Sequence, residues 1–570
     1  MNGCKCVLCM AVVTAFLLAA AASYGQISAH STGSTSSPQV GSGQANSVEP
    51  KGPAKLSEPN KTGNFAEVSL GTLPDQIFGI VRSPDQRHIA LIAGKDGKFQ
   101  VVVDGNAGAV YETIGQDFLI FSPDSNHLAY VAQNGSTRQV VIDGVASPVY
   151  ENIGTVAFSP NSKRVAYIAQ KNDKARLVID GQAGPEYDLL TMRSAPVFSD
   201  DSNRVAYIVW LGAQKLVAVD GKAGPVYDDI GSAAFGPGGK RIAYVGRKGI
   251  NRQVVIDGRP GATYSEIGKE FPVFSPNGER IAYRVKKDNK WQVIVDDQNG
   301  PVYDNIPEGT IVFSPDSNHI AYVARNSNYK QIVIVDNNIA GPEYDIIRQG
   351  SVVFIANGNR MVYTAKNDDK WQLVIDGNAG AEYDAIKEGT PIFSPDSKHI
   401  AYAVWKGGKW QVIVDGQGGP QYDAVLDGTV VFSPDSKHIA YAAKRGYKQI
   451  VVVDGNAGAE YDAIRKGHPV FSADSRHITY AARKDNKWQV VVDDQNGPAY
   501  DEIVEGTVVF SSDGNHAAYA AVKGDRQMVV VDNIAGPKYE GIICLPTAVG
   551  EGFETIALRE KTLYRVIWKP

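Results

Sequence analysis

Short apolar runs alternate with polar turns along most of the chain, and no helical period is present after residue 64. A typical stretch contains GTVVF at 428–432, HIAYAA at 438–443, QIVVVD at 449–454 and EYDAI at 460–464. Each run is rich in β-branched and aromatic residues and is bounded by Gly, Pro, Asp or Asn. The pattern predicts four short β-strands, a to d, and an all-β fold.

This four-strand unit recurs about every 39 residues, a period typical of stacked supersecondary units. Arg82 marks the first copy and Val549 marks a shortened last copy. The copies between them are marked by a phenylalanine: Phe121, Phe158, Phe198, Phe235, Phe274, Phe313, Phe354, Phe393, Phe432, Phe471 and Phe510. Four short strands per ~40 residues are typical of one β-propeller blade, so the chain is predicted to form a β-propeller of about 13 four-stranded blades.

About 13 blades exceed the usual 4–8 per ring, so we expect two consecutive propellers of seven and six blades, in either order. We place the first at 65–337 and the second at 338–570, because the seventh copy carries extra residues on both sides of Asp336. The ends of the chain are complementary. The segment 66–70 resembles an unpaired strand d, and the last copy stops after a strand c at 563–568. Pairing these two segments would remove two open edges.

The first 64 residues differ from the repeats. Lys5 precedes an apolar run at 7–22, and small residues follow, so 1–25 is predicted to be a secretory signal peptide. A retained anchor helix is the alternative, although the run is short for a span of ~20 residues. Residues 26–64 are rich in Ser, Gly and Pro and are predicted to be a disordered linker. We therefore expect a periplasmic or secreted protein with no membrane span after cleavage.

Overall composition narrows the function classes. The chain has 43% hydrophobic and 21% charged residues and a formal net charge of −5, so it lacks the basic field expected of a nucleic-acid-binding protein. It contains no His-Glu-x-x-His, Gly-x-Ser-x-Gly or phosphate-binding glycine motif. After signal cleavage Cys544 would be the one remaining cysteine, which excludes an internal disulfide. No catalytic residue, metal or cofactor is predicted.

Several polar residues recur once per copy and have a structural explanation. The Ser-Pro-Asp carboxylates are expected to cap turns rather than bind metal. The Asp-Gly pairs between strands c and d fit tight hairpins. The histidines before strand b are spread around the ring, so they do not converge on one metal, and we expect them to pack or to bond a turn. They are His127, His319, His399, His438, His477 and His516.

The b–c loops carry the candidate binding residues. The position six before the turn Asp is Lys or Arg in most copies, and the next position is Trp in four. The candidate binding residues are Lys290, Trp291, Lys370, Trp371, Lys409, Trp410, Lys487 and Trp488. Strand parity puts the b–c and d–a connections on one face, the loop face, and the a–b and c–d turns on the other, the turn face. A ring of cations and aromatics could hold an acidic peptide, a polysaccharide or an anionic polymer through charge and stacking. The alternative is that each Trp covers the edge of a neighbouring blade.

The phrase FSPDSKHIAY at 393–402 and its copies resemble the repeat of TolB-type, WD-repeat-like β-propellers, also found in prolyl-oligopeptidase-like enzymes. The resemblance covers 65–570 and implies a propeller of four-stranded blades. It implies little about the ligand, and the chain lacks the N-terminal α/β domain of TolB proteins and the hydrolase domain of the oligopeptidases.

The leading hypothesis is an exported, non-enzymatic binding or scaffold protein that recognises a protein or a cell-envelope glycan through its loop face. An alternative is an enzyme, of lyase or glycosidase type, with a site in the central groove. Its residues would break the repeat, as Met192-Arg193 and 355–357 do. A third hypothesis is a purely structural surface protein.

Overall fold

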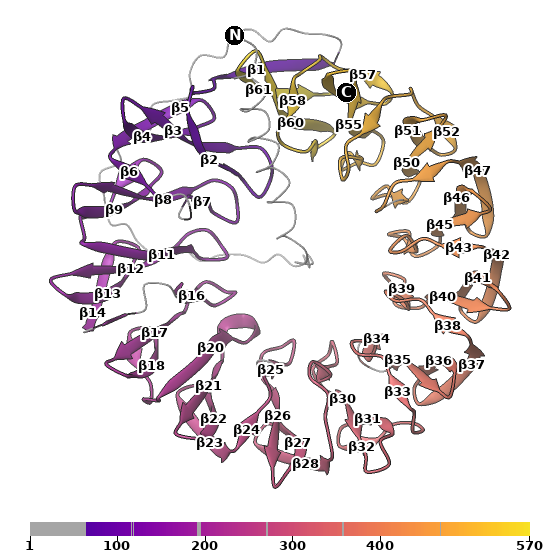
Figure 1. The fold of residues 1–570 in the computed structure, drawn as a ribbon, viewed down its shortest axis with the longest axis horizontal. Helices are drawn as coiled ribbons and strands as arrows, with labels where there is room; N and C mark the ends of the chain where they lie inside the picture. Colours follow the sequence, from indigo (N-terminus) through magenta and orange to yellow (C-terminus); the bar gives the residue numbers. More distant parts are fainter. Residues whose placement is uncertain are drawn as a thin grey trace, which may run out of the picture. The chain divides into compact units, whose positions relative to one another are not determined.

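The computed structural model describes residues 64–570, apart from 116, 118, 188, 191–194, 270–271, 356–357, 359 and 468 (Figure 1). The described residues form one compact unit. The described residues contain 13 antiparallel sheets and a short 3₁₀ turn, η2 at Pro237–Gly239. The prediction of an all-β propeller with four-stranded blades is therefore confirmed. The expected signal peptide and linker lie outside the described residues except for Asn64.

The blades are numbered along the chain, with the strands of each in chain order. The first six are blade 1 (β2 Ile77–Arg82, β3 Ile89–Lys95, β4 Lys98–Val103, β5 Asn106–Tyr111), blade 2 (β6 Thr113–Ile114, β7 Ile120–Phe121, β8 Leu128–Asn134, β9 Thr137–Ile142, β10 Val145–Ala146), blade 3 (β11 Asn152–Phe158, β12 Val165–Lys171, β13 Lys174–Ile179, β14 Gln182–Tyr187), blade 4 (β15 Leu189–Leu190, β16 Val197–Phe198, β17 Val205–Leu211, β18 Gln214–Val219, β19 Lys222–Ala223), blade 5 (β20 Asp229–Phe235, β21 Ile242–Lys248, β22 Asn251–Ile256, β23 Arg259–Tyr264) and blade 6 (β24 Glu266–Ile267, β25 Val273–Phe274, β26 Ile281–Lys287, β27 Lys290–Val295, β28 Gln298–Tyr303).

The other seven are blade 7 (β29 Val312–Phe313, β30 Ile320–Arg325, β31 Gln331–Val335, β32 Asn338–Ile339), blade 8 (β33 Ile346–Ile347, β34 Val353–Ile355, β35 Arg360–Asn367, β36 Lys370–Ile375, β37 Asn378–Tyr383), blade 9 (β38 Ala385–Ile386, β39 Ile392–Phe393, β40 Ile400–Lys406, β41 Lys409–Val414, β42 Gln417–Tyr422), blade 10 (β43 Ala424–Val425, β44 Val431–Phe432, β45 Ile439–Arg445, β46 Lys448–Val453, β47 Asn456–Tyr461), blade 11 (β48 Ala463–Ile464, β49 Val470–Phe471, β50 Ile478–Lys484, β51 Lys487–Val492, β52 Gln495–Asn496), blade 12 (β53 Glu502–Ile503, β54 Val509–Phe510, β55 Ala517–Lys523, β56 Arg526–Val531, β57 Ile534–Ala535) and blade 13 (β58 Gly541–Ile542, β59 Thr547–Val549, β60 Gly552–Arg559, β61 Thr562–Trp568, with β1 Phe65–Thr72).

Blade 10 illustrates the local structure. The innermost strand is split into β43 and β44, and both pair with β45. Asp454 (φ 50°) and Gly455 (φ 79°) turn the chain from β46 to β47, and two positive φ values in a two-residue loop are typical of the type I′ hairpin that Asp-Gly predicts. The outermost strand differs from the expected strand d at 460–464. It starts directly after this turn, and Ala463 already belongs to the next blade.

The ring closes by pairing of the two ends of the chain. β1 runs antiparallel to β61, with Phe65 opposite Trp568 and Thr72 opposite Thr562. The expected pairing of an N-terminal strand d with the last strand c is thus confirmed. Figure 1 shows β1 beside β61, between the first and the last blades of one ring.

The structure differs from the expected division into seven plus six blades, because residue 337 lies in an ordinary blade. The junction that follows it, between blades 7 and 8, is packed like its neighbours, with Tyr344 and Tyr363 in T-shaped contact and a shared apolar cluster. The first extra residue of the seventh copy lies in the loop between β30 and β31. This loop joins two strands of blade 7, so the extra residue does not mark the end of a ring. Repeated interfaces stack without interruption, so nothing at 337 separates two domains.

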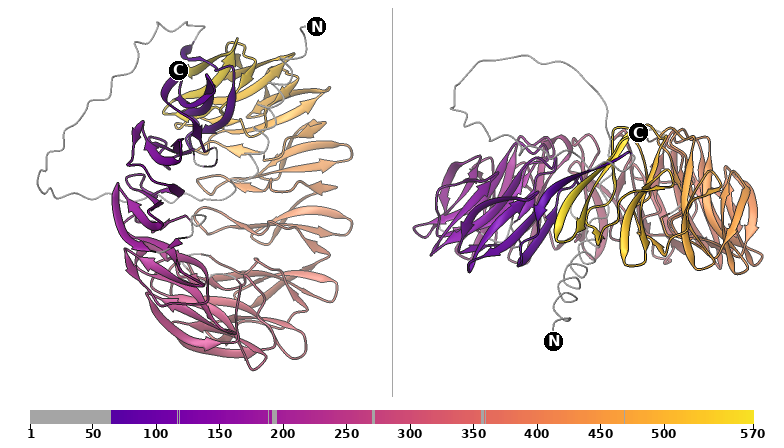
Figure 2. Two further views of the ribbon diagram at one scale, coloured as in Figure 1. Left: turned by 60° about the vertical axis from the view of Figure 1, so that its left-hand side comes forward. Right: turned by 90° about the horizontal axis from the view of Figure 1, so that it is seen from above.

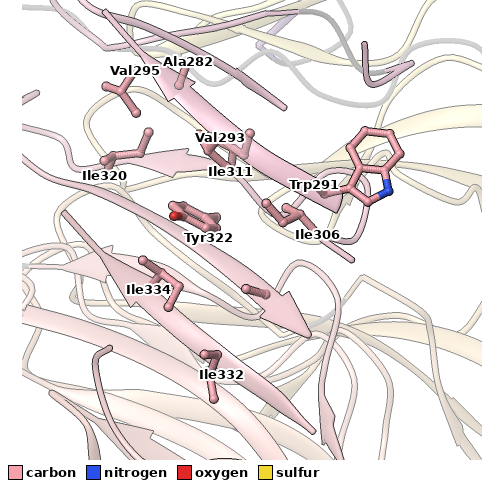
Figure 3. Packing of buried hydrophobic residues seen from close by; sticks show 11 residues of the cluster. Ala282, Trp291, Val293, Val295, Ile306, Ile311, Ile320, Tyr322, Ile332 and Ile334 are labelled. Carbon is pink, nitrogen blue, oxygen red and sulfur yellow. The ribbon is translucent and has the colours of Figure 1, made fainter. Parts of the chain in front are cut away.

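The core is distributed over the junctions between blades. The buried apolar side chains of the described residues form 13 clusters, one at each junction, including the one between blades 13 and 1. Figure 3 shows the cluster of blades 6 and 7, to which β27 contributes Trp291 and Val293, β30 contributes Tyr322 and β31 contributes Ile334. Stacking of neighbours therefore buries both faces of each sheet.

Candidate functional site

The loop face is defined by the ends of the strands, as blade 10 shows. Arg445 and Lys448 close the β45–β46 hairpin at the same end of the blade at which Tyr461 pairs with Gln449. The chain passes there to the next blade. The strands run between this face and the turn face (Figure 2). The predicted Lys and Trp residues therefore share one face, as strand parity requires.

Each predicted lysine forms an ion pair with the Asp that follows the outermost strand of its own blade. The pairs are Lys290–Asp304, Lys370–Asp384, Lys409–Asp423 and Lys487–Asp501. The hydrogen bond from Lys370 lowers the pKa of Asp384, and the same bond raises the pKa of Lys370. The ring of lysines is thus matched by a ring of carboxylates, which reduces its attraction for anions.

These carboxylates also accept hydrogen bonds from backbone amides of the next blade. The second oxygen of Asp423 accepts a hydrogen bond from the amide of Gly446 (2.6 Å), and that of Asp501 accepts one from Gly524 (2.7 Å). Both amides lie in the β-hairpin of the following blade. The Lys–Asp pair is therefore part of a latch between blades. Sequence reasoning missed this latch, although an Asp follows the repeated Tyr in most copies.

The four tryptophans lie beneath cationic side chains. Trp291 is only 9% exposed, and Trp371, Trp410 and Trp488 are partly buried. The cationic group lies over each indole at 4.4 Å for Arg284 on Trp291, 4.3 Å for Arg348 on Trp371, 4.9 Å for Lys387 on Trp410 and 4.2 Å for Arg465 on Trp488. Such contacts are worth roughly 0.5–2 kcal/mol each.

The same cations reach the following blade. Arg348 donates to the carbonyl oxygens of Ile386 (2.7 Å) and Lys387 (3.3 Å), and Lys387 pairs with Asp427 at 2.6 Å. Each indole therefore packs under a bridge between blades, which fits the alternative that the Trp covers a blade edge. The binding role of the eight residues stays a prediction.

On the turn face the Ser-Pro-Asp carboxylates cap turns, as expected. In blade 10 the Ser433 hydroxyl donates to Asp435 (2.6 Å), and the Asp435 carboxylate also accepts the amide of Lys437 (3.1 Å). These bonds lower the pKa of Asp435 to about 2. The Asp435 amide donates to Ser475 of blade 11 (2.9 Å), so the turn also joins two blades.

The histidines each bond one carboxylate. His438 Nδ1 lies 2.7 Å from Asp454 Oδ2, and the other oxygen of Asp454 accepts the amide of Ile439. In blades 3 to 6 and in blade 8 an arginine takes the place of the histidine, as in the Arg280–Asp296 and Arg360–Asp376 pairs. Within the described part of the chain, no three His, Cys, Asp or Glu side chains are grouped as metal ligands.

The tips of three hairpins on the loop face carry large exposed side chains. Ile250 of blade 5 is 87% exposed, Tyr329 of blade 7 is 77% exposed and Tyr447 of blade 10 is 96% exposed. Sequence reasoning did not select them. Their signal is a large aliphatic or aromatic residue at a turn position where most other copies have Gly, Asn or Asp.

Comparisons with known proteins give a fold likeness and no family. No protein-family model and no curated protein matches the chain. A structure described as the crystal structure of the eukaryotic initiation factor is 13% identical, with 67% of this chain and 95% of that chain covered and a TM-score of 0.27. The Dos1 propeller is 10% identical, with 59% and 92% covered and a TM-score of 0.25. The dihydro-heme d1 dehydrogenase NirN is 14% identical, with 51% and 73% covered and a TM-score of 0.22. No functional conclusion follows from likenesses this low.

In the described residues, no helix is long and apolar enough to span a bilayer.

Proposed function

We propose that this protein is an exported binding scaffold, built on a TolB-type, WD-repeat-like repeat, that recognises a protein or a cell-envelope glycan through its loop face. The observation that carries the proposal is the exposure of Ile250, Tyr329 and Tyr447 at hairpin tips on this one face. Large side chains with so little packing contribute little to the fold. Tyr is among the residues enriched at binding hot spots.

The arrangement of aromatic residues supports one preferred arc of the loop face. Trp371, Trp410, Tyr447 and Trp488 come from four consecutive blades, 8 to 11. The indoles are partly covered, so Tyr447 is the member of this arc that offers nearly its whole surface to a partner. Aromatic groups in such a row suit either a sugar polymer or an extended protein surface.

A binding role accounts for the repeated polar groups better than catalysis does. The recurrent Lys, Asp and His side chains are held by partners that join strands or blades, as in Lys409–Asp423 and His438–Asp454. A catalytic site needs an unrepeated constellation. Met192-Arg193 and 356–357, where the repeat is broken, lie outside the described residues.

A capture experiment tests the proposal. A chain starting at residue 27 is incubated with envelope extract and, separately, with purified peptidoglycan sacculi. The variant Ile250→Ser/Tyr329→Ser/Tyr447→Ser is expected to lose most capture while it keeps its far-ultraviolet spectrum and melting temperature.

The matched control is Val145→Ser/Ile339→Ser, which changes exposed apolar residues of the outermost strands rather than of the loop face. It is expected to capture as the wild type does. Equal capture by the tip variant and the wild type would refute binding through the loop face.

A further inference from the structure

A cleft opens on the turn face between blades 9 and 10, opposite to the loop face. Its volume is about 770 Å³, within the range of roughly 300–1,000 Å³ typical of small-molecule sites. Val412, Val414 and Phe432 supply apolar lining, while Gln417, Lys437 and His438 supply polar lining.

At the cleft, a turn residue lacks the side chain that could cover it. Gly455 occupies the second position of the β46–β47 turn, and in blade 12 the same position is Asn533. Asn533 Oδ1 lies 2.3 Å from the point where a Cβ on Gly497 would stand, so its side chain covers the outermost strand of the preceding blade. The equivalent of Gly497 beside the cleft is Gly419, which is uncovered. The cavity beside Asn533 measures about 220 Å³.

A second substitution also leaves space. In blade 6 the turn-face cation is Arg280, which reaches over Phe313 of the next blade (5.4 Å) and donates to the carbonyl of Asn318 (2.7 Å). Blade 9 has His399 instead, and this shorter side chain bonds Asp415 of its own blade at 2.7 Å. The junction between blades 9 and 10 therefore lacks the arginine bridge.

The charges around the cleft are matched within the protein. Lys398 lies 3.3 Å from Asp396, and Lys437 lies 3.2 Å from Asp435. Asp415 and Asp454 each hold an imidazole through Nδ1, which leaves the Nε2 atoms of His399 and His438 for a ligand. With neutral histidines the lining carries four aspartates against two lysines, so an anionic ligand is disfavoured. Asp415 and Asp454 are already engaged by the imidazoles, and hydrogen-bond donors and acceptors beside an apolar wall favour a neutral ligand with many hydroxyl groups and an apolar face.

A neighbouring cleft indicates a ligand with repeating units. Between blades 8 and 9 a cavity of about 500 Å³ is lined in part by Lys398, His399 and Asp415, which also line the first cleft. In the first cleft the equivalent positions of blade 10 are Lys437, His438 and Asp454, so similar groups recur in the two clefts. A polymer of like units can use both clefts, whereas a peptide of mixed sequence would need unlike pockets.

We propose that the clefts flanking blade 9 on the turn face bind a neutral oligosaccharide. The site is separate from the loop face, so it does not depend on the loop-face proposal. The sugar rings would lie against Phe432 and Val414, with their hydroxyl groups at His399, His438 and Gln417.

The test uses Gly455→Asn, which copies the residue that narrows the cavity in blade 12. Because Asn533 and Asn337 hold positive φ at equivalent positions, this change fits the turn. The control is Gly221→Asn in blade 4. Gly221 and Gly455 have φ values of 77° and 79°, and each has the ring of a proline of the preceding blade 3.9 Å from its Cβ position.

Calorimetric titration uses cellotetraose, maltotetraose and chitotetraose as probes, with a neutral Ser/Ala octapeptide for comparison. We expect the wild type and Gly221→Asn to bind at least one tetrasaccharide, and Gly455→Asn to bind it at least about tenfold more weakly. The loop-face tip variant should bind it as the wild type does, which separates the two sites.

Three results would overturn the inference. Equal affinity of Gly455→Asn and wild type for the tetrasaccharide would show that the sugar does not bind in the cleft. No binding of the three sugars at millimolar concentration would exclude a neutral oligosaccharide, and tighter binding of the octapeptide would assign the cleft to a different class of ligand.

Discussion

Glu67 in β1 accepts hydrogen bonds from both terminal nitrogens of Arg559 in β60, at 2.9 and 3.0 Å, across 492 positions of the chain. The hydroxyl of Tyr539, which precedes blade 13, donates to the same carboxylate. The Glu67 side chain is only 7% exposed. One buried carboxylate therefore joins the strand that closes the ring to the last two blades.

Glu67→Ala is expected to destabilise the ring at its closure. Loss of one partner from a buried ion pair typically costs about 3–5 kcal/mol, and because Arg559 is partly exposed we expect about 2–3 kcal/mol here. Urea unfolding followed by tryptophan fluorescence measures the change. The control is Glu186→Ala, which breaks the more exposed Arg176–Glu186 pair and should cost at most about 1 kcal/mol. Equal losses in the two variants would contradict a special role for the closing strand.

Removal of the hydroxyl from each of two buried tyrosines is expected to have different effects on the free energy of unfolding. Tyr539→Phe removes a hydrogen bond to the Glu67 carboxylate and should lower the free energy of unfolding by about 1.5–3 kcal/mol. The Tyr322 hydroxyl is buried without a partner among the described residues, so Tyr322→Phe should leave the free energy unchanged or raise it by up to about 1 kcal/mol. A comparable loss in both variants would show that the hydroxyl of Tyr322 does have a partner.

The sequence predicted the blade, its turns and the closing strand, because these depend on local signals. The Asp-Gly turns can be read within one copy, the period from neighbouring copies, and the unpaired segment at 66–70 at one end of the chain. The number of blades per ring cannot, since it depends on small angles summed over many interfaces. The extra residue before Asp336 suggested a break between two rings, yet it only lengthens the β30–β31 loop.

The sequence predicted on which face the candidate binding residues lie, but it did not predict which residues they contact. The face of the Lys and Trp residues follows from strand parity. Their partners belong in part to the next blade, as when Arg348 lies over Trp371 and donates to Ile386. Predicting such contacts requires knowing how neighbouring blades stack, and the sequence pattern of one copy does not contain this information. Exposure of Tyr447 likewise depends on how far its hairpin projects.

The bridge made by Arg348 leads to a prediction for the interface of blades 8 and 9. Arg348→Met keeps the apolar stem but removes the contact with Trp371 and two hydrogen bonds to carbonyl oxygens, so we expect a loss of about 2 kcal/mol of unfolding free energy. Arg445→Met, at an exposed arginine 5.6 Å from Tyr422, should cost at most about 0.5–1 kcal/mol. Chemical denaturation measures both losses. Equal losses would show that Arg348 contributes no more to stability than an exposed surface arginine.

Acid should weaken the turn face. Hydrogen bonds from serine hydroxyls and turn amides lower the pKa of Asp124, Asp396 and Asp435, the last to about 2. A carboxyl whose pKa is lower in the folded state stabilises the fold fully above its ordinary pKa of 3.8, and this stabilisation is lost as the pH falls towards 2. The urea midpoint should therefore decrease between about pH 4 and pH 2.

The triple variant Asp124→Asn/Asp396→Asn/Asp435→Asn should show a shallower decrease. Asn is compatible with this turn, because Asn161 and Asn277 accept the same serine bond in blades 3 and 6. Asp369→Asn, which changes an exposed carboxylate, should follow the wild-type curve. An unchanged pH dependence in the triple variant would show that other groups cause the acid sensitivity.

Cys544 provides a probe of ring opening. Its side chain is fully buried at the junction of blades 13 and 1, beside Leu70 and Ile89, and burial raises the pKa of the thiol to about 12. In a chain starting at residue 27 it is the one cysteine, so a thiol reagent reports on this junction alone. At about pH 8 we expect negligible labelling of the folded protein and complete labelling in urea, because a thiol must be exposed and ionised to react. Glu67→Ala should accelerate labelling without denaturant, since it weakens the strand that covers the junction, whereas Glu186→Ala should not. Rapid labelling of the wild type would mean that the ring opens readily between its first and last blades.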